Sequence, residues 1–320
     1  MQALRGLLYF RECPEVQQAI DALQQHPNEL IQSALRSFER PDTSGNVGRL
    51  SQSHSPFYLR NLWINADVRK ILPRIPDESI HLTFTSPPYY NARDYSIYQI
   101  TKEGRFFVLN TSPVLVPRMS RQHASKRYAI PFDIHPLLTE IGWEFIDDII
   151  WLKPDPSAKN RNGGFFQHRK PLAYKPNSVT EYVMVYRKKT NKLIDWNIRQ
   201  YPEEVIERSR VRDDYEKTNV WRIAPTTDKV HPAVFPLELA KRVIQFYSYE
   251  GDLIFDPFAG SGTVGVASLQ LNRYFLLTEQ ESVYARRAFE WILEQGLLTA
   301  APPQMLDESA FSQMMEFENG

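Results

Sequence analysis

Two hydrophobic rhythms alternate along the chain from residue 56 onward. Short apolar runs typical of buried strands occupy residues 59–65, 79–84, 105–110, 143–152, 181–187, 252–255 and 274–278. Between them, apolar residues at the spacing of amphipathic helices occupy residues 68–72, 136–141, 236–247, 263–271 and 281–293. Strands that alternate with helices predict an α/β fold with a mostly parallel sheet and helices on both faces.

The two ends of the chain and one internal stretch follow other patterns. Pro14 suits a first helical turn and opens a helical pattern, which residues 30–38 continue as a second amphipathic helix. Residues 40–55 are polar and turn-rich, as in a linker. Residues 188–228 show no clear period, and the tail from Pro302 is acidic, so we expect that tail to be frayed.

Composition narrows the classes of protein. The 320 residues include 38 Lys plus Arg and 38 Asp plus Glu, and this zero net charge excludes a protein that coats DNA indiscriminately. Cys13 is the single cysteine, so neither an internal disulfide nor a thiolate zinc cage can form, and we expect no metal. The first residues lack the pattern of a secretory signal, and no apolar run approaches a membrane span of about 20 residues. We therefore expect a cytoplasmic protein with no membrane partner.

A glycine-rich loop joins a late predicted strand to its helix. Gly260, Gly262 and Gly265 form the pattern G-x-G-x-x-G, which lets the backbone turn tightly and lets a ligand lie against it. The next predicted strand ends at Glu279, whose carboxylate can accept hydrogen bonds from two ribose hydroxyls. This unit predicts a nucleoside-containing cofactor. The alternatives are a plain helix start and an NAD site; the late position and the preceding D-P-F sequence argue against NAD.

A stiff loop follows the predicted strand at residues 79–84 and reads T-S-P-P-Y-Y. Its two prolines lack N–H groups, so the loop carbonyls cannot easily join a ladder and can face a ligand. Ser86 adds a hydroxyl acceptor and Tyr89 adds a flat ring. Two acceptors for the hydrogens of a planar amino group, beside a ring that stacks on the base, favour transfer of a methyl group to that nitrogen. The alternative is an ordinary turn stiffened by proline.

Together the two loops resemble the motifs of the S-adenosylmethionine-dependent DNA amino-methyltransferases. The catalytic motif of that family matches Ser86-Pro87-Pro88-Tyr89, and its cofactor motif matches D-P-F-A-G-S-G-T at residues 256–263. The catalytic motif comes first along the chain, as in the β group of the family. The resemblance covers residues 59–293 and implies a Rossmann-like methyltransferase fold.

The resemblance also implies which residues contact the cofactor, S-adenosylmethionine. These are Asp256, Pro257, Phe258, Gly260, Gly262, Thr263, Glu279, Asp67 and His231. Glu279 would bind the ribose and Asp67 the adenine amino group. Three of these residues have a structural alternative: Asp67 caps the helix at residues 68–72, Thr263 starts its helix, and His231 packs within the segment H-P-A-V-F-P.

Serine before Pro-Pro-Tyr indicates the N4 amino group of cytosine as the methyl acceptor, whereas family members with Asp or Asn there usually methylate N6 of adenine. By the resemblance, Ser86 and the Pro87 carbonyl orient the amino group, Pro88 stiffens the loop and Tyr89 stacks on the base. Two hypotheses from other classes stay open. One is a nicotinamide-dependent oxidoreductase, in which the Ser-Pro-Pro-Tyr loop would have no role. The other is a DNA-binding protein that has lost catalysis and would bind the cofactor without turnover.

Double-stranded DNA is the implied partner, and the target base must flip out of the duplex before it can react. Two basic stretches are candidates for the phosphate contacts: Arg118, Arg121, Lys126 and Arg127 in one, and Lys159, Arg161, Arg169 and Lys170 in the other. In our interpretation Lys188, Lys189 and Lys192 extend this surface. For any single residue, ordinary solvated charge is the alternative. A cognate restriction endonuclease that acts separately is a further candidate partner.

These assignments divide the chain into five parts. They are a helical extension with its linker at residues 1–55, the catalytic half of the methyltransferase domain at 56–187, a target-recognition region at 188–228, the cofactor-binding half at 229–296 and an acidic tail at 297–320. The extension either covers the sheet, contacts DNA or forms a homodimer.

Two features depart from the family pattern. Only residues 91–104 separate the catalytic loop from the next strand. This length is at the lower limit for a crossover between parallel strands. The helix that the family usually has there is therefore either very short or lost. Gln280-Glu281 follows Glu279, in place of the Asp-Pro or Asn-Pro often found in the family.

Overall fold

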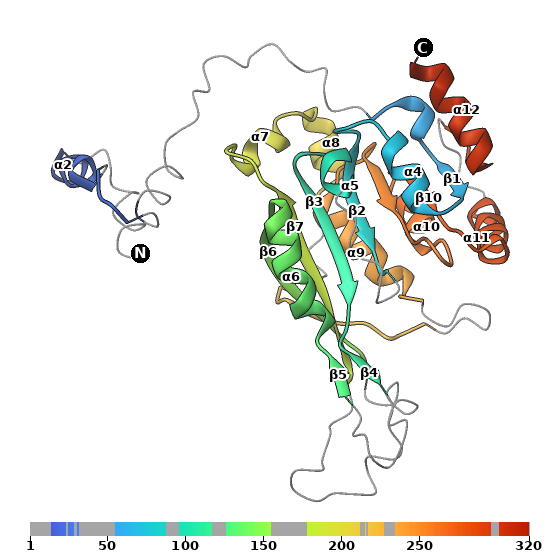
Figure 1. The fold of residues 1–320 in the computed structure, drawn as a ribbon, viewed down its shortest axis with the longest axis horizontal. Helices are drawn as coiled ribbons and strands as arrows, with labels where there is room; N and C mark the ends of the chain where they lie inside the picture. The colour runs from blue at the N-terminus through green and yellow to red at the C-terminus, as the bar shows by residue number, and fades with distance from the viewer. Residues whose placement is uncertain are drawn as a thin grey trace, which may run out of the picture.

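The computed structural model describes residues 14–23, 25–28, 31, 55–87, 96–116, 126–154, 178–211, 215, 217–226, 234–295 and 301–319. A nine-stranded sheet with strand order β11-β1-β10-β9-β2-β3-β7-β6-β8 forms its centre (Figure 1). In chain order these strands are β1 (Leu62–Asn65), β2 (Ile80–Thr85), β3 (Thr101–Thr111), β6 (Trp143–Leu152), β7 (Thr180–Lys188), β8 (Val220–Arg222), β9 (Leu253–Asp256), β10 (Tyr274–Thr278) and β11 (Gln304–Asp307).

Most neighbouring strands run parallel, as the sequence predicts. From β11 to β3 every pairing is parallel, whereas β7 runs antiparallel to both β3 and β6, and β8 is parallel to β6. Consequently β10, β9, β2, β3 and β6 all end at one edge of the sheet, where β7 begins. We name this edge the carboxyl edge and the opposite one the amino edge; ligands of open α/β sheets bind at carboxyl ends.

Helices cover both faces of the sheet and build two core layers. One layer contains α9 (Leu237–Tyr247), α10 (Thr263–Gln270) and α11 (Ser282–Glu294), and the other contains α4 (Val68–Ile71), α5 (Ser96–Ile100), α6 (Ile130–Ile141) and α12 (Glu308–Asn319). The alternation of side chains along β3 shows the division, because Val108 belongs to the first layer while Phe107 and Leu109 belong to the second.

The connection from β2 to β3 is a parallel crossover with a very short helix. The five-residue helix α5 runs directly into β3 at Thr101, whose hydroxyl donates to the Ile97 carbonyl at 2.7 Å. β2 and β3 nevertheless pair in parallel up to Thr85 and Leu109. Of the two alternatives for this segment, the very short helix is confirmed, and the sheet is continuous beside the catalytic motif.

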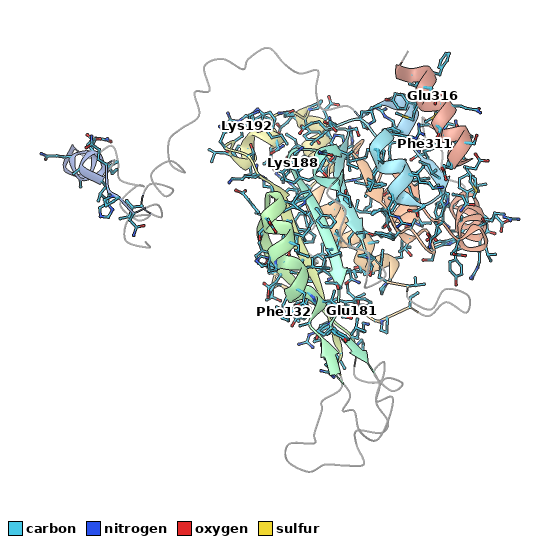
Figure 2. All side chains as sticks on the ribbon, in the orientation of Figure 1. Phe132, Glu181, Lys188, Lys192, Phe311 and Glu316 are labelled. Carbon is cyan, nitrogen blue, oxygen red and sulfur yellow. The ribbon has the colours of Figure 1, made fainter. Side chains whose placement is uncertain are left out.

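The expectation that the tail from Pro302 is frayed was wrong. β11 pairs in parallel with β1 along its full length, and α12 buries Phe311 and Met315 against the second core layer (Figure 2). The Asp307 carboxylate accepts a hydrogen bond from the Ala310 N–H at 2.8 Å and so caps the start of α12. The acidic residues of this segment lie on a helix whose apolar side holds it to the sheet.

The N-terminal helix α2 (Pro14–Leu23) begins at Pro14, as predicted. Apart from Ile31, the second predicted helix lies outside the described residues, as does all of residues 40–54. In the part of the chain that the structure describes, no helix is both long and apolar enough to span a membrane.

A buried polar cluster ties the segment after β7 to the amino edge. That segment contains α7 (Ile194–Ile198) and α8 (Glu203–Arg208), and its Tyr201 hydroxyl donates to Asp252 at 2.6 Å. Asp252 also pairs with the buried guanidinium of Arg105, and the Tyr249 N–H donates to it at 2.8 Å. Burial alone would raise the pKa of Asp252, but the charges of Arg105 and His81 and the hydrogen bonds from Tyr201 and Tyr249 together hold this pKa below its usual value.

Candidate functional site

The glycine-rich loop begins where β9 ends, at the carboxyl edge. Gly260 and Gly262 adopt positive φ angles of 50° and 80°, a conformation that favours glycine. A Cβ atom on Gly262 would lie 3.1 Å from the Ala288 Cβ and 3.3 Å from the Trp63 ring. The loop therefore needs glycine here for both its turn and its close packing.

Glu279 follows β10 and faces this loop. One carboxylate oxygen accepts a hydrogen bond from the Gly260 N–H at 2.9 Å, and the other accepts from the Glu281 N–H at 3.0 Å. Each oxygen keeps a further lone pair, so the carboxylate can still accept from two vicinal hydroxyls. Glu281 contributes through its backbone, so the departure at Gln280-Glu281 leaves this carboxylate in position.

Asp256 is fully buried at the end of β9. The Thr85 hydroxyl and the Phe258 N–H donate to the same carboxylate oxygen, at 2.7 Å and 3.0 Å. Burial raises the pKa of Asp256 to about 7; the two hydrogen bonds oppose this shift and the nearby Glu279 charge adds to it. At neutral pH this carboxyl is therefore divided between its protonated and ionised forms.

The catalytic motif stands directly beside the glycine-rich loop. β2 lies between β9 and β3, and Ser86 and the buried Pro87 follow its last residue, Thr85. The hydrogen bond from Thr85 to Asp256 joins the two motifs, which are 171 positions apart in the chain. Pro88 and Tyr89 lie outside the described residues.

A chain of three polar residues that no sequence motif identified leads away from Ser86. The Asn110 amide nitrogen donates to the Ser86 hydroxyl at 3.3 Å and to the Glu181 carboxylate at 2.9 Å. Glu181 forms an ion pair with Lys153, which lies over the Trp151 ring at 4.4 Å. These residues belong to β3, β7 and the end of β6, so no local spacing links them. The available sequence signal was the polar character of Asn110 and Glu181 at the ends of apolar strands.

Three other predicted cofactor residues differ in how the structure places them. The Asp67 carboxylate accepts from the Arg69 N–H at 3.0 Å and from the Arg69 side chain, so it caps α4, and the side-chain bond lowers the pKa of Asp67. Thr263 is the first residue of α10 and exchanges a hydrogen bond of 3.0 Å with Ser261. His231 lies outside the described residues.

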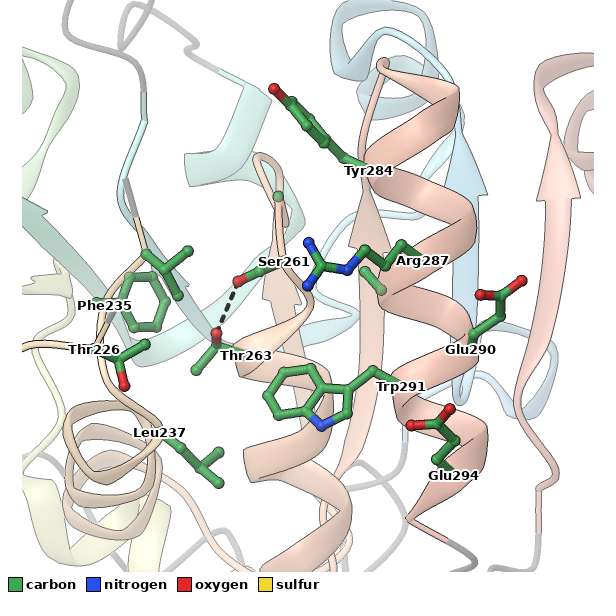
Figure 3. A pocket seen from close by; sticks show the side chains of 13 residues that line it. Thr226, Phe235, Leu237, Ser261, Thr263, Tyr284, Arg287, Glu290, Trp291 and Glu294 are labelled. Atoms are coloured by element: carbon green, nitrogen blue, oxygen red, sulfur yellow. Dashed lines mark hydrogen bonds between the residues drawn. The ribbon is translucent and has the colours of Figure 1, made fainter. Parts of the chain in front are cut away.

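A cavity of about 480 Å³ opens on the α9 and α11 side of the glycine-rich loop (Figure 3). Phe235 and Trp291 line it with apolar surface, and Figure 3 shows the Arg287 guanidinium pointing toward Ser261 and Thr263 of the loop. Phe235 belongs to the segment H-P-A-V-F-P, whose described residues 234–236 lie beside the loop. Glu290 and Glu294 also line the cavity, so its wall combines apolar surface with one cation and two carboxylates. Such a lining suits a ligand that has a short aliphatic part and charged groups of both signs.

The two basic stretches begin and end at the carboxyl edge. The hairpin of β4 (Val114–Val116) and β5 (Lys126–Tyr128) extends beyond the end of β3 (Figure 1), and Arg127 lies on β5. The second stretch connects the end of β6 to the start of β7, which are antiparallel neighbours. The remaining candidates lie outside the described residues or have no described side chain: Arg118, Arg121, Lys126, Lys159, Arg161, Arg169 and Lys170.

Lys188 and Lys192 lie at the amino edge, so the interpretation that they extend the same basic surface was wrong. Lys188 pairs with Glu78 at 2.6 Å and Lys192 with Glu103 at 2.8 Å. Figure 2 shows both lysines at the opposite end of the sheet from Glu181. Strand β7 starts at the carboxyl edge, where its second residue Glu181 lies, and ends at Lys188 on the amino edge. The length of this strand therefore separates both lysines from the carboxyl edge.

Comparison with known proteins gives a consistent picture. The family model of N6 and N4 DNA methylases matches residues 80–290. The orphan methyltransferase M.BamHII of Bacillus amyloliquefaciens is 30% identical over 249 residues, which cover 68% of this chain and 89% of that protein. The type II beta methyltransferase M.BslI of Bacillus sp. (strain NEB-606) is 27% identical over 266 residues, which are 74% of this chain but 28% of M.BslI.

Two solved structures share the fold. The putative DNA modification methylase TTHA0409 of Thermus thermophilus, complexed with S-adenosyl-L-methionine, is 24% identical with a TM-score of 0.59 and covers 77% of this chain and 98% of its own. The cytosine-N4-specific PvuII DNA methyltransferase is 17% identical with a TM-score of 0.53 and covers 84% and 95% of the two chains. At these identities the likeness establishes the arrangement of strands and helices.

Proposed function

This chain belongs to the N6/N4 DNA methylase family, and from that premise we propose that it transfers a methyl group from S-adenosylmethionine to the N4 amino group of cytosine in duplex DNA. The hydrogen bond from Thr85 to Asp256 carries the proposal, because it holds the catalytic motif against the cofactor motif at one edge of the sheet. Serine at position 86 supports cytosine over adenine as the target.

The residues of the carboxyl edge fit this cofactor. When bound, S-adenosylmethionine supplies a methyl group on a cationic sulfur, and the S–C bond breaks as the N–C bond forms. Glu279 takes the ribose hydroxyls, and the backbone at Gly260 and Gly262 lets the cofactor lie close to the loop. Asp67 is the proposed acceptor for the adenine amino group, and the Arg69 side chain that contacts both of its carboxylate oxygens must move aside for it. The cavity at Phe235 and Arg287 takes the methionine end, where the guanidinium meets the carboxylate.

Ser86 and Pro87 prepare the amino group for attack. The hydroxyl oxygen of Ser86 and the carbonyl oxygen of Pro87 each accept one hydrogen from the amino nitrogen. This geometry draws the nitrogen toward a tetrahedral shape, and its lone pair becomes available to form the new N–C bond. The nitrogen is cationic after the transfer and releases one proton to solvent along the hydrogen bond to Ser86. Tyr89 stacks on the flipped base and keeps it in line.

DNA binds across the carboxyl edge. The two basic stretches contact phosphates on either side of the catalytic motif, and these contacts position the duplex without reading its sequence. Within residues 188–228, β8 ends at this edge beside β6, whereas α7 and α8 lie at the amino edge. We therefore assign base recognition to the part that follows β8. The setting is the cytoplasm of a bacterial cell, with a cognate restriction endonuclease as a separate protein.

Nucleoside analysis tests the proposal directly. The protein is expressed in a host that lacks its own DNA methylation, and the digested DNA is analysed by mass spectrometry. N4-methylcytosine in the digest supports the proposal. N6-methyladenine shows instead that adenine is the methyl acceptor. If neither modified nucleoside is found, methyl transfer to either base is refuted.

A pair of serine variants at the two ends of β2 assigns the catalytic role. Ser86→Ala should lower methyl transfer by about 100-fold or more, because it removes one acceptor of the amino group, while calorimetry shows unchanged cofactor affinity. Ser79→Ala is the matched control at the amino edge, where the hydroxyl donates to the Pro76 carbonyl. Full activity of Ser86→Ala would refute the assignment.

A further inference from the structure

The Ser86 hydroxyl belongs to a buried chain of polar side chains that crosses three strands. Asn110 is 2% exposed and Glu181 is 8% exposed. Asn110 lies opposite Val183 in the antiparallel pair of β3 and β7, and Glu181 precedes Val183 by two residues. Asn110 and Glu181 therefore point to the same face of the sheet, which allows their side chains to meet.

The Glu181 carboxylate fixes the orientation of the Asn110 amide. An ionised carboxylate only accepts hydrogen bonds, so the amide must present its nitrogen, and this bond is 2.9 Å long. The second hydrogen of the same nitrogen is then directed to the Ser86 oxygen at 3.3 Å. Among the described residues, the Asn110 carbonyl oxygen has no hydrogen-bond partner, so the nitrogen alone orients this side chain.

This orientation defines what Ser86 can do. The Ser86 oxygen accepts from Asn110 on one side and keeps its second lone pair for another donor. The hydroxyl proton must point away from Asn110, because the amide nitrogen offers no lone pair. A serine held in this way offers its remaining lone pair as a hydrogen-bond acceptor.

Lys153 completes the chain on the far side of Glu181. The side chains of Lys153 and Glu181 are 14% and 10% exposed, and the ammonium lies over the Trp151 ring. The Lys153 backbone N–H also donates to the Val179 carbonyl at 2.8 Å, which joins the end of β6 to the residue before β7. A partly buried carboxylate needs such a cation, since an isolated charge in this position would be poorly solvated.

We propose that Asn110, Glu181 and Lys153 are positioning residues that hold the Ser86 oxygen toward the amino group of the target base. The proposal rests on the methyl transfer proposed above and adds three residues that no motif identifies. Asn110 acts directly on Ser86, Glu181 orients Asn110, and Lys153 holds Glu181 in place through the ion pair. The chain acts on the rate of transfer, whereas cofactor binding depends on the loop at Gly260.

The first test is the single-turnover rate of Asn110→Ala in the full-length protein. We expect this rate to fall by about 10- to 100-fold, the effect of a misplaced catalytic group, with the KM for S-adenosylmethionine changed by less than about 2-fold. Asn197→Ala is the matched control, because Asn197 is a buried asparagine at the amino edge that bonds to Arg187 and the Glu103 carbonyl. The control should lose stability and keep its rate.

Two further comparisons separate positioning from mere packing. Glu181→Gln keeps an acceptor for Asn110, so it should retain at least about 5-fold more activity than Glu181→Ala. In the double variant, Asn110→Ala should lower the rate by less than about 2-fold below that of Ser86→Ala alone, because Asn110 acts through Ser86.

The outcomes separate this proposal from the proposed function. An active wild type with an Asn110→Ala rate within about 3-fold of normal overturns the positioning role and leaves the methyl transfer standing. Equal losses in Glu181→Gln and Glu181→Ala, or full additivity with Ser86→Ala, also overturn it. A wild type that forms neither N4-methylcytosine nor N6-methyladenine overturns both proposals together.

Discussion

Thr85 and Ser86 are consecutive residues, yet each bonds to a different neighbouring strand. Thr85 donates to Asp256 of β9 on the cofactor side, and Ser86 accepts from Asn110 of β3 on the other side. The end of β2 is thus held laterally from both directions by hydrogen bonds of 2.7 Å and 3.3 Å. In the proposed methyl transfer, donor and acceptor must be closely aligned, and these two contacts are our candidates for that alignment.

The Asp256 carboxyl predicts a specific dependence of stability on pH. Its pKa is raised to about 7, so between pH 4 and pH 7 the folded protein binds a proton that the unfolded chain has released, and the free energy of unfolding falls as pH rises. Asp256→Asn keeps an acceptor for Thr85 and Phe258 and cannot ionise. Its stability relative to wild type should therefore improve by about 2 to 4 kcal/mol from pH 4.5 to pH 8, measured by urea unfolding.

Asp67→Asn is the control for this measurement. The hydrogen bond from Arg69 lowers the pKa of Asp67, so this carboxylate stabilises the fold above its unfolded pKa and stops doing so as pH falls. The Asp67 variant should therefore lose stability relative to wild type as pH rises, by a small amount because the site is exposed. A pH-independent difference for Asp256→Asn would contradict the assigned protonation.

At the scale of elements, local pattern predicted most of the sheet, and its failures have physical causes. Period-2 runs and helical spacing located the strands and helices around the cofactor loop because each buries one face in a core layer. The tail was misjudged because its acidic residues dominate the composition, although Phe311 and Met315 repeat at the spacing of one helical face. The contacts among Asn110, Glu181 and Lys153 depend on strand register, which no single segment encodes.

Helix α12 should contribute strongly to folding. Phe311 is fully buried against the second core layer, so Phe311→Ala should lower the free energy of unfolding by about 3 to 5 kcal/mol. Phe317 is 85% exposed on the same helix, so Phe317→Ala should stay within about 0.5 kcal/mol of wild type. Urea unfolding measures both variants, and equal effects would mean that the helix does not dock as described.

At the scale of the whole molecule, the two edges of the sheet have different tasks. The carboxyl edge gathers both motifs and the described ends of the basic stretches, whereas the amino edge holds the buried pair of Arg105 and Asp252 and the segment with α7 and α8. The net charge of zero is the sum of this uneven distribution and of the acidic tail. Because electrostatic attraction to DNA depends on local potential, a neutral chain can still bind duplex DNA through one edge.

The salt dependence of DNA binding tests whether the carboxyl edge, and not the amino edge, contacts DNA. Each lost phosphate contact reduces the slope of log K against log salt concentration by about 1, so the double variant Lys159→Ala, Arg161→Ala should flatten the slope by about 1 to 2. The double variant Lys189→Ala, Lys192→Ala removes the same charge at the amino edge and should leave the slope within about 0.3. Fluorescence anisotropy with a labelled duplex at several salt concentrations gives both slopes. Equal flattening in the two variants would place the duplex on both edges, which a single flipped base at Ser86 does not allow.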